Sequence, residues 1–572
     1  MAESLKFWWR IIYSMVLIWV CFAGHSVWAK PNSIDDEIMR HQHMQQQARD
    51  QQLAPPTPDI RFSVDGSEDP LNGYPIESPC FMIRKVHLDQ VEYLPGWAIR
   101  ELQRATEPAL NRCLGRQGLN LLMARLQDRL IDHGWVTTRV LAPQQSLLSG
   151  QLRLIVMPGL VRHIQFDKDS HARVWLAAAL PLSSGDMLDL REIEQGLENM
   201  QRLPGVQVRM ALKPAEQPGE SDIVLSRHQQ ETLRWGSWVD DTGTKATGRK
   251  QGGVMLALDN SLGMNDMFQL TASRDTAFVR GRHSRNYSAR YSVPYGFWKG
   301  SISASDYDYR RTVAGFKGNS YDYTGNSQML DVQLTRMLHR GANHKTQLAS
   351  DIITRQSRSF INDTEIDVQH RTTTHWRLAL NHRHYIKEST VDVEASYTRG
   401  LRAFGAHPAP EEAVGDATAL SRIIGLSAQT TVPFHFAGQA FRYQSQYQYQ
   451  RSNTPLTTQE QFAIGNRWTV RGFDGENSLS ADDGWYWRNE LGWQWPSWQQ
   501  ELYIGLDHGE VKGHGSEWLA GKRLTGSVLG VRGHLLATDY DVFVSRPISH
   551  PEGFRTSSVT AGFSVSWQGA FF

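Results

Sequence analysis

The sequence predicts a membrane all-β fold, a β-barrel formed by residues 230–572, preceded by two small α/β modules and an N-terminal helix. Three observations carry this prediction. Hydrophobic residues recur at every second position beyond residue 230, as in Tyr287-x-Ala289-x-Tyr291-x-Val293. Before residue 230 an α/β unit occurs twice, and the N-terminus has the pattern of an export signal. At roughly 20 residues per strand with its connection, about 340 residues accommodate a 16-stranded barrel.

Residues 1–29 are predicted to be a signal peptide. Lys6 and Arg10 provide positive charge, Ile11 to Phe22 is apolar, and Val27-Trp28-Ala29 offers a cleavage site, so we expect the mature chain to begin at Lys30. The alternative is a membrane anchor, but the apolar run is shorter than the roughly 20 residues of a spanning helix.

A polar, glutamine-rich helix is predicted at residues 33–53. Ser33 and Asp36 have the spacing of a capping box, and the helix ends before Pro55. Its surface is too polar for a core helix, which leaves a helix in a wet cavity or a disordered tail. Residues 54–78 are rich in turn-forming residues and predict a linker.

Two modules with the order β-α-α-β-β follow, at residues 79–157 and 158–229. The first is expected to have strands at 81–88, 136–141 and 151–157, with helices at 97–106 and 119–130. The second is expected to have strands at 161–166, 206–213 and 222–227, with helices at 171–180 and 190–200.

Cys80 and Cys113 are predicted to form a disulfide. Cys21 leaves with the signal peptide, so these are the cysteines of the mature chain, and an exported chain enters an oxidising compartment. The alternative is a pair of buried thiols.

The barrel region carries many aromatic residues and ends on Phe571-Phe572. A final strand of this kind can pair with the first strand and leave no free edge. A soluble all-β sandwich or propeller is the alternative, which the export signal disfavours. Tryptophans are candidates for the aromatic girdles at the membrane interfaces: Trp235, Trp238, Trp298, Trp376, Trp485, Trp487, Trp493 and Trp495.

The sequence gives no indication of an enzyme, a cofactor or a metal site. It lacks His-Glu-x-x-His, Gly-x-Ser-x-Gly and Cys-x-x-Cys motifs, and Gly243–Lys250 lacks the Lys-Ser/Thr ending of a phosphate loop. His41 and His43 are two residues apart and do not share a helix face. A net charge of +1 does not suggest a nucleic-acid partner.

Three motifs resemble the outer-membrane transporters of two-partner secretion systems. They are Val470-Arg471-Gly472-Phe473, Gly134-Trp-Val-Thr-Thr138 and Val293-Pro-Tyr-Gly-Phe-Trp298. The resemblance implies that the two modules are POTRA domains in the periplasm and that the 33–53 helix plugs the barrel at rest. It also implies a monomeric transporter in the lipid of the bacterial outer membrane.

The resemblance further implies a functional loop inside the lumen, at about residues 466–484. In the family, the loop arginine pairs with an acid on the barrel wall, and here Leu506-Asp507-His508-Gly509 matches the wall motif. Arg471 and Asp507 are therefore the predicted pair, although Leu506 stands where the family usually has Phe. Asp474 and Glu476 are competing partners, and an exposed loop arginine is the alternative.

The implied function is export of one large partner exoprotein, an adhesin, a haemolysin or a contact-dependent toxin. This partner, with its N-terminal secretion domain, crosses unfolded and without ATP after meeting the POTRA domains, whose sheet edges can accept an added strand. The alternatives are that the modules act only as spacers, that the chain is a barrel assembly factor, or that it is a passive solute channel.

Overall fold

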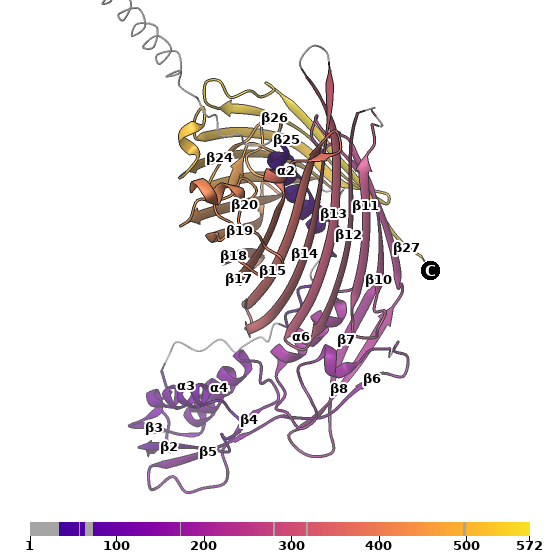
Figure 1. The fold of residues 1–572 in the computed structure, drawn as a ribbon. Helices are drawn as coiled ribbons and strands as arrows, with labels where there is room; N and C mark the ends of the chain where they lie inside the picture. The colour runs from indigo at the N-terminus through magenta and orange to yellow at the C-terminus, as the bar shows by residue number, and fades with distance from the viewer. Residues whose placement is uncertain are drawn as a thin grey trace, which may run out of the picture.

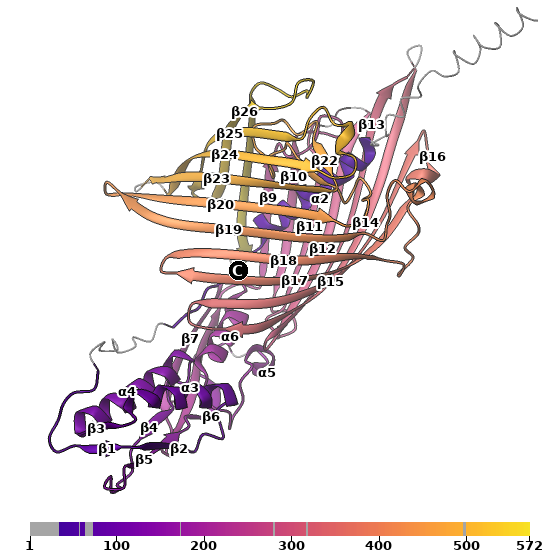
Figure 2. The ribbon, with the colours of Figure 1, turned by 90° about the vertical axis from the view of Figure 1, so that its left-hand side faces the viewer.

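The computed structural model describes residues 34–55, 58–62, 73–171, 173–277, 279, 281–315, 319–495 and 499–571. The predicted signal peptide lies outside the described residues. Two small α/β domains lie at one end of a large barrel, and the helix α2 (Ile34–Leu53) lies inside the barrel (Figures 1 and 2). No helix in the described ranges combines the length and apolar character needed to cross a bilayer.

The barrel is closed by antiparallel pairing between its last and first strands, β27 and β9. Each strand pairs with its sequence neighbour, except where the connection from β20 to β23 intervenes, and β16 is a two-residue extension at the end of β15. The strands are β9 (Leu233–Asp240), β10 (Gln251–Asp259), β11 (Met267–Asp275), β12 (Arg282–Tyr295), β13 (Trp298–Ala314), β14 (Ser320–Arg340), β15 (His344–Ile361), β16 (Thr364–Glu365), β17 (Arg371–Ile386), β18 (Ser389–Leu401), β19 (Arg422–Phe436), β20 (Gln439–Ser452), β23 (Asp483–Trp495), β24 (Gln500–Lys512), β25 (Arg523–Leu535), β26 (Thr538–Ser549) and β27 (Thr560–Phe571).

Alternation along the strands separates a lipid face from a lumen face. In β10, Val254, Leu256 and Leu258 are exposed on the outside, whereas Met255 and Ala257 between them are buried. Successive side chains of a strand point to opposite faces, so one apolar set faces the membrane and the other set is free to be polar. The predicted 16-stranded barrel is confirmed.

The predicted girdle is wrong at one tryptophan. Trp298, Trp487 and Trp495 are exposed on the outer surface, but Trp238 is only 2% exposed and contacts Leu53 of α2. Trp238 lies on β9 with the parity of the buried Arg234 and Asp240, so alternation turns its ring into the lumen.

The first domain has a three-stranded sheet of β2 (Lys85–Asp89), β5 (Gln151–Met157) and β4 (Arg139–Leu141), covered by α3 (Gly96–Thr106) and α4 (Arg116–Asp132). The strand predicted at 81–88 is divided at Arg84, because the amides of Arg84 and Lys85 both donate to the carbonyl of Gly150. Its first part, β1 (Phe81–Ile83), pairs with β3 (Arg112–Leu114) instead. The strand predicted at 136–141 is shorter in the structure, where β4 begins only at Arg139.

The second domain has a sheet of β6 (Leu160–Phe166), β8 (Glu220–Gln229) and β7 (Val206–Pro214), with α6 (Leu190–Gln201) packed on it. The helix predicted at 171–180 is reduced to α5 (Leu176–Ala179). The amides of His171 and Trp175 donate to the carbonyls of Arg227 and Gly263, which holds the preceding segment in a non-helical path. Short 3-10 helices elsewhere are Glu107–Ala109, Asp367–Gln369, Pro410–Val414 and Ser516–Trp518.

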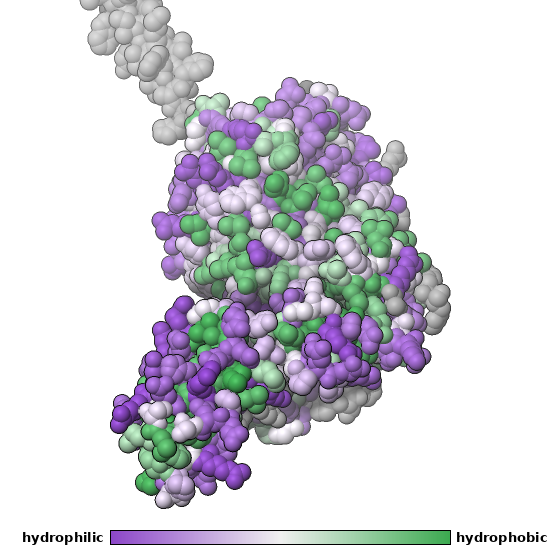
Figure 3. All heavy atoms as spheres, turned by 90° about the horizontal axis from the view of Figure 1, so that it is seen from below, coloured by the Kyte–Doolittle hydropathy of each residue, from purple (hydrophilic) through white to green (hydrophobic). Residues whose placement is uncertain are grey.

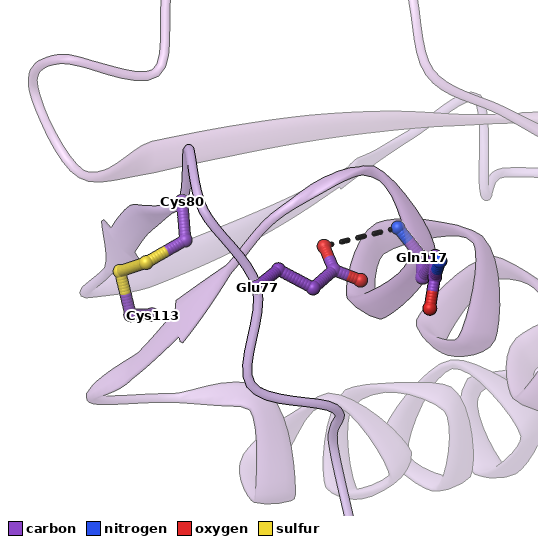
Figure 4. Close-up of a disulfide and its surroundings, with 4 residues drawn as sticks. All are labelled: Glu77, Cys80, Cys113 and Gln117. Atoms are coloured by element: carbon purple, nitrogen blue, oxygen red, sulfur yellow. Dashed lines mark hydrogen bonds between the residues drawn. A yellow bond between two sulfur atoms is a disulfide. The ribbon is translucent and has the colours of Figure 1, made fainter.

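A disulfide joins Cys80 to Cys113, with 5.3 Å between their Cα atoms (Figure 4). It ties the start of β1 to β3 in the first domain. Beside it, the carboxylate of Glu77 accepts hydrogen bonds from the amides of Gln117 and Gly118, at 3.1 and 2.9 Å, and so caps the positive end of α4. In the chain-entropy account, closing this loop stabilises the fold by about 3–4 kcal/mol.

The two domains extend away from the barrel at one end. Viewed from that end, hydrophilic and hydrophobic residues are interspersed on the domain surface (Figure 3). The sheets leave β2 and β4 as edges in the first domain, and β6 and β7 in the second.

Candidate functional site

The connection between β20 and β23, residues 453–482, folds back into the barrel rather than away from it. We call it the lumen loop. It contains a small hairpin of β21 (Phe462–Ile464) and β22 (Leu479–Ala481). Val470, at 0% exposed, and Phe473, at 3%, are buried within it.

An apolar core fixes the lumen loop against one side of the barrel. The ring of Phe473 packs edge-on against Phe554, from the loop between β26 and β27, with 5.8 Å between centroids. Burying such rings away from water is the main stabilising contribution of a cluster of this kind. Its members are Phe462, Ile464, Val470, Phe473, Leu479, Ala481, Tyr486, Val511, Leu524 and Phe554.

Arg471 forms a two-pronged ion pair with Asp507 of β24. Its Nε donates to Oδ2 at 2.7 Å and its Nη2 donates to Oδ1 at 2.8 Å, while the backbone amide of Arg471 also donates to Oδ2, at 2.9 Å. Asp507 is fully buried and Arg471 is 7% exposed. Bidentate geometry and three donors to one carboxylate offset much of the cost of burying both charges.

A second acid, Glu490 of β23, completes the site, and the sequence analysis missed it. Its Oε2 accepts from Nη1 of Arg471 at 2.5 Å, and its Oε1 accepts from Arg532 at 2.5 Å. Arg532 also donates to Glu501, which pairs with Arg442. The alternation of side chains could have indicated it. In the neighbouring strands β23 and β24, Glu490 faces the same side of the wall as Asp507.

Glycines on the wall make room for the lumen loop. A Cβ added at Gly505 would lie 2.5 Å from Nη2 of Arg471, and one at Gly509 would lie 2.9 Å from a methyl of Val470. At Gly526 the added atom would lie 1.9 Å from the carbonyl oxygen of Arg471. Gly472 has φ of +115°, a conformation that favours glycine, so the loop and wall fit only with these small residues.

The other residues considered for the site lie elsewhere. Leu506, where the family usually has Phe, is 54% exposed on the outer face of β24, so this difference does not touch the ion pair. Asp474 accepts from the hydroxyl of Ser557 at 2.8 Å, and Glu476 accepts from the amide of Lys245 at 3.0 Å. Neither acid pairs with Arg471 in the described contacts.

The N-terminal half of α2 contacts the lumen loop. Arg40 donates to the carbonyl of Thr458 at 3.1 Å and to the hydroxyl of Ser478 at 2.9 Å. The same hydroxyl donates to Glu37 at 2.7 Å. The loop is therefore part of the seat of the helix.

The C-terminal half of α2 contacts the barrel wall. Arg49 pairs with Asp240 of β9, and its guanidinium lies 4.7 Å from the ring centre of Trp238. Arg290 of β12 donates to Asp50 at 3.2 Å. Leu53 packs on Trp238 and Met255 in a small apolar cluster. The N-terminal half also reaches the wall, where Ile38 and Met39 pack on Tyr307 and Tyr309 of β13.

A cavity of about 620 Å³ remains between α2, the lumen loop and strands β20 and β23 to β27. Its walls carry charged side chains of both signs. A space lined in this way suits ions and polar chains rather than an apolar ligand. The charged residues that line it are Arg49, Arg442, Arg467, Arg471, Arg488, Arg532, Glu490, Glu501, Asp539 and Asp541.

Comparison with known proteins identifies the architecture. Residues 219–533 match the family model for the haemolysin secretion/activation protein ShlB/FhaC/HecB. Residues 81–159 match the ShlB-type POTRA domain and residues 160–214 match a second POTRA model.

Relatives and solved structures agree with this match. The chain is 36% identical to outer membrane transporter CdiB-2 of Burkholderia pseudomallei, over 91% of this chain and 92% of that protein. It is 26% identical to the hemolysin transporter protein HpmB of Proteus mirabilis, over 76% of this chain and 77% of that protein. The structure of CdiB from Acinetobacter baumannii superposes with a TM-score of 0.81 and 28% identity, covering 94% of this chain and 99% of that one.

These matches cover both POTRA domains and most of the barrel, including the lumen loop and its wall. The resemblance drawn from Val470–Phe473 is confirmed at the level of the family. The chain belongs to the haemolysin secretion/activation protein family ShlB/FhaC/HecB, the two-partner secretion transporters of the bacterial outer membrane.

Proposed function

We propose that this chain, as a monomer, carries one large unfolded exoprotein from the periplasm to the cell surface through the barrel lumen, after α2 has left it. The observation that carries the proposal is the position of α2. It lies inside a barrel that is already closed by its own strands, so the barrel does not need the helix to complete its sheet.

The contacts of α2 are of a kind that water can replace. Hydrogen bonds exchanged for bonds to water contribute only about 0.5–1.5 kcal/mol each, and α2 is connected to the rest of the chain at its C-terminal end by the 54–78 segment. Removal of the helix would leave a polar, water-filled passage. An extended polypeptide can keep its own polar groups hydrated there.

The Arg471–Asp507 pair is proposed to hold the lumen loop in place while cargo passes. Removing one member of a buried ion pair leaves an uncompensated charge and costs roughly 3–5 kcal/mol. The loop would otherwise be free to occupy the passage. Val470, Gly472, Phe473 and Gly509 support this position through the apolar core and the close approach of loop and wall.

The POTRA domains are proposed to receive the exoprotein before it enters the pore. Their sheets have edge strands with backbone groups that an extended segment can pair with. The proposal assigns no catalytic step, cofactor or ATP to the chain. Whether the cargo is an adhesin, a haemolysin or a contact-dependent toxin stays a prediction from the resemblance.

Comparison of secreted proteins tests the function directly. Culture medium and cell surface from the parent and from a strain lacking this gene are compared by mass spectrometry. We expect one large protein to be missing outside the deleted strain, to return on complementation, and to be retained as a degraded periplasmic form. Unchanged secreted proteins under conditions where the transporter is present in the membrane would overturn the proposal.

A further inference from the structure

The segment Pro58–Phe62 lies at the domain end of the barrel, between α6 and strands β14, β15 and β17. We call it the linker segment. It follows α2 closely in sequence and contacts both the second POTRA domain and the barrel wall. These contacts form a site that is distinct from the lumen loop and from the edges of the POTRA sheets.

The site binds the main chain of the linker segment. The amide of Ile60 donates to Oε1 of Glu198 at 3.0 Å, and the amide of Phe62 donates to Oε1 of Glu194 at 2.7 Å. Arg340 donates to the carbonyl of Ile60 at 2.6 Å. Amides two residues apart point to the same side of an extended chain, so this pattern recognises extended backbone whatever its side chains.

Two side-chain contacts add selectivity. Asp59 accepts from Lys345 at 3.0 Å and from the hydroxyl of Tyr385 at 2.7 Å. Ile60 packs against the apolar core of the second POTRA domain. The site therefore favours an acidic residue followed by a branched apolar one.

The site does not depend on the linker segment for its shape. Glu194 also pairs with Arg191 at 2.7 Å and with Arg340 at 3.1 Å, and Glu198 pairs with Arg340 at 2.8 Å and with Lys345 at 2.5 Å. These carboxylates would keep their cationic partners after the linker segment leaves. What they would lose is the backbone amides, which another extended chain can supply.

Departure of α2 would empty the site. The four residues 54–57 that separate α2 from the linker segment span at most ~14 Å when fully extended. With the linker segment fixed, the end of α2 could move by at most about twice this reach, which is less than the ~30 Å length of a 20-residue helix. A helix that clears its seat must therefore take the linker segment with it. The site is therefore blocked while the pore is plugged and available once the pore opens.

We propose that this is a binding site for an extended segment of the exported polypeptide at the pore entrance, with the linker segment as a built-in competitor. The proposal rests on the transport function proposed above. In this proposal the linker segment mimics the cargo. During export, the exoprotein makes the contacts that the linker segment makes at rest.

Peptide binding in trans tests the site itself. The probe is a fluorescein-labelled peptide with the sequence of residues 54–62, added to the full-length transporter in lipid nanodiscs and followed by fluorescence anisotropy. In the parent the tethered copy has the advantage of high effective concentration and blocks the probe. We expect Ile60→Pro, which removes the tethered amide, to increase probe affinity at least tenfold.

Two controls make the result specific. Glu198→Gln added to Ile60→Pro should reverse the gain, and a probe with proline in place of its isoleucine should not bind. Phe62→Ala, which keeps the tethered amide, should behave as the parent does. Equal probe binding to the parent and Ile60→Pro, or insensitivity to Glu198→Gln, would overturn the proposal.

The rate of export, measured once the exoprotein has been identified, distinguishes two roles of the site. It either binds cargo, or it only holds the linker segment in place, which we call a latch. A latch predicts that Ile60→Pro and Glu198→Gln change export in the same direction, since both release the linker segment. A cargo site predicts opposite directions: faster export for Ile60→Pro, and export slowed severalfold for Glu198→Gln. Heat-modifiable migration of both variants confirms that the barrel has folded, and Glu194→Gln provides a second site variant.

The outcomes distinguish failure here from failure of the transport function. If a missing exoprotein is found but the probe does not bind, transport stands and this site is rejected as a cargo site. If the probe binds but no exoprotein depends on the gene, the site holds only the linker segment and the transport proposal fails.

Discussion

Two segments occupy the barrel lumen, α2 and the lumen loop, and they are held there by different physical means. The loop is joined to a strand at each end, has a ten-residue apolar core and contributes a doubly paired, buried arginine. The helix does not connect two strands, and it is held by one buried ion pair, Arg49–Asp240, by hydrogen bonds and by two small apolar clusters. The difference supports the proposal that the lumen loop stays in the pore during export and that α2 leaves it.

The largest effect is expected from breaking the ion pair that holds the lumen loop. Arg471→Ala leaves Asp507 buried with Arg488 no closer than 3.9 Å, so docking of the loop should weaken by roughly 3–5 kcal/mol. The barrel itself should remain heat-modifiable and in the outer membrane. Export, measured as exoprotein in the medium, should fall on the order of 100-fold; export at the parent level would show that the loop needs no such anchor.

Asp507→Ala should reproduce this loss, because it removes the other member of the pair. Arg471→Lys is the matched control. It keeps the charge but cannot form the two-pronged pair, so partial export is expected. Full export by the lysine variant would show that charge alone holds the loop.

The next largest effect is expected from removing the plug. Deletion of residues 33–53 should raise the conductance of single pores in planar bilayers several-fold, because it empties the lumen without interrupting the strands. Thermal unfolding of the barrel should be nearly unchanged. Unchanged conductance would instead indicate that α2 spends little time in the lumen.

A smaller effect is expected from loosening the plug. Arg49→Gln removes the charge that pairs with Asp240 inside the lumen. The cost should be smaller than for Arg471→Ala, because glutamine can still donate a hydrogen bond and Asp240 keeps those from the amide and hydroxyl of Thr242. A loss of about 1.4 kcal/mol would shift the equilibrium between seated and departed helix about tenfold. The fraction of time that a pore spends in its open conductance level should rise accordingly. Equal open times in the variant and the parent would remove this pair from the account.

The barrel and the central ion pair of the lumen loop could be predicted from the sequence, whereas the second acid of the site could not. Alternation defined the barrel, because lipid and lumen impose opposite polarity on successive residues such as Val254 and Met255. The Arg471–Asp507 pair followed from the family resemblance, which rests on one motif around each partner. Glu490 was missed because it lies in no motif, and its role depends on the register between β23 and β24.

Other details depended on contacts between distant parts of the chain. The helix predicted at 171–180 is shortened because Trp175 donates its amide to Gly263, 88 residues away in sequence. Trp238 was assigned to the membrane interface, but α2 covers its ring from inside. Residues 54–78 were predicted to be a linker, and the sequence did not indicate that Ile60 and Asp59 in it have partners on α6, β14, β15 and β17. Single-sequence patterns contain no information on such pairings.

The smallest effect is expected at the one departure from the family motif. Leu506→Phe restores the usual residue, but this side chain faces outward and does not contact the ion pair. Export, heat-modifiability and pore conductance should all match the parent, with any change in stability within about 0.5 kcal/mol. A marked change in export would mean that the outer face of β24 also takes part.

The central claim is that α2 leaves the lumen during export whereas the lumen loop stays docked. The Nε2 of Gln45 on α2 lies 2.5 Å from the hydroxyl of Thr242 at the end of β9, so cysteines at both positions can be bridged by a short, reducible crosslinker. Asp474 and Ser557, in contact at 2.8 Å, allow the same bridge between the lumen loop and the loop after β26. Single-cysteine variants serve as controls.

Export by these two bridged transporters, before and after reduction, is the deciding measurement. The account predicts that the Gln45→Cys/Thr242→Cys bridge stops export until it is reduced, whereas the Asp474→Cys/Ser557→Cys bridge leaves export unchanged. Undiminished export with α2 bridged to the wall would contradict the account.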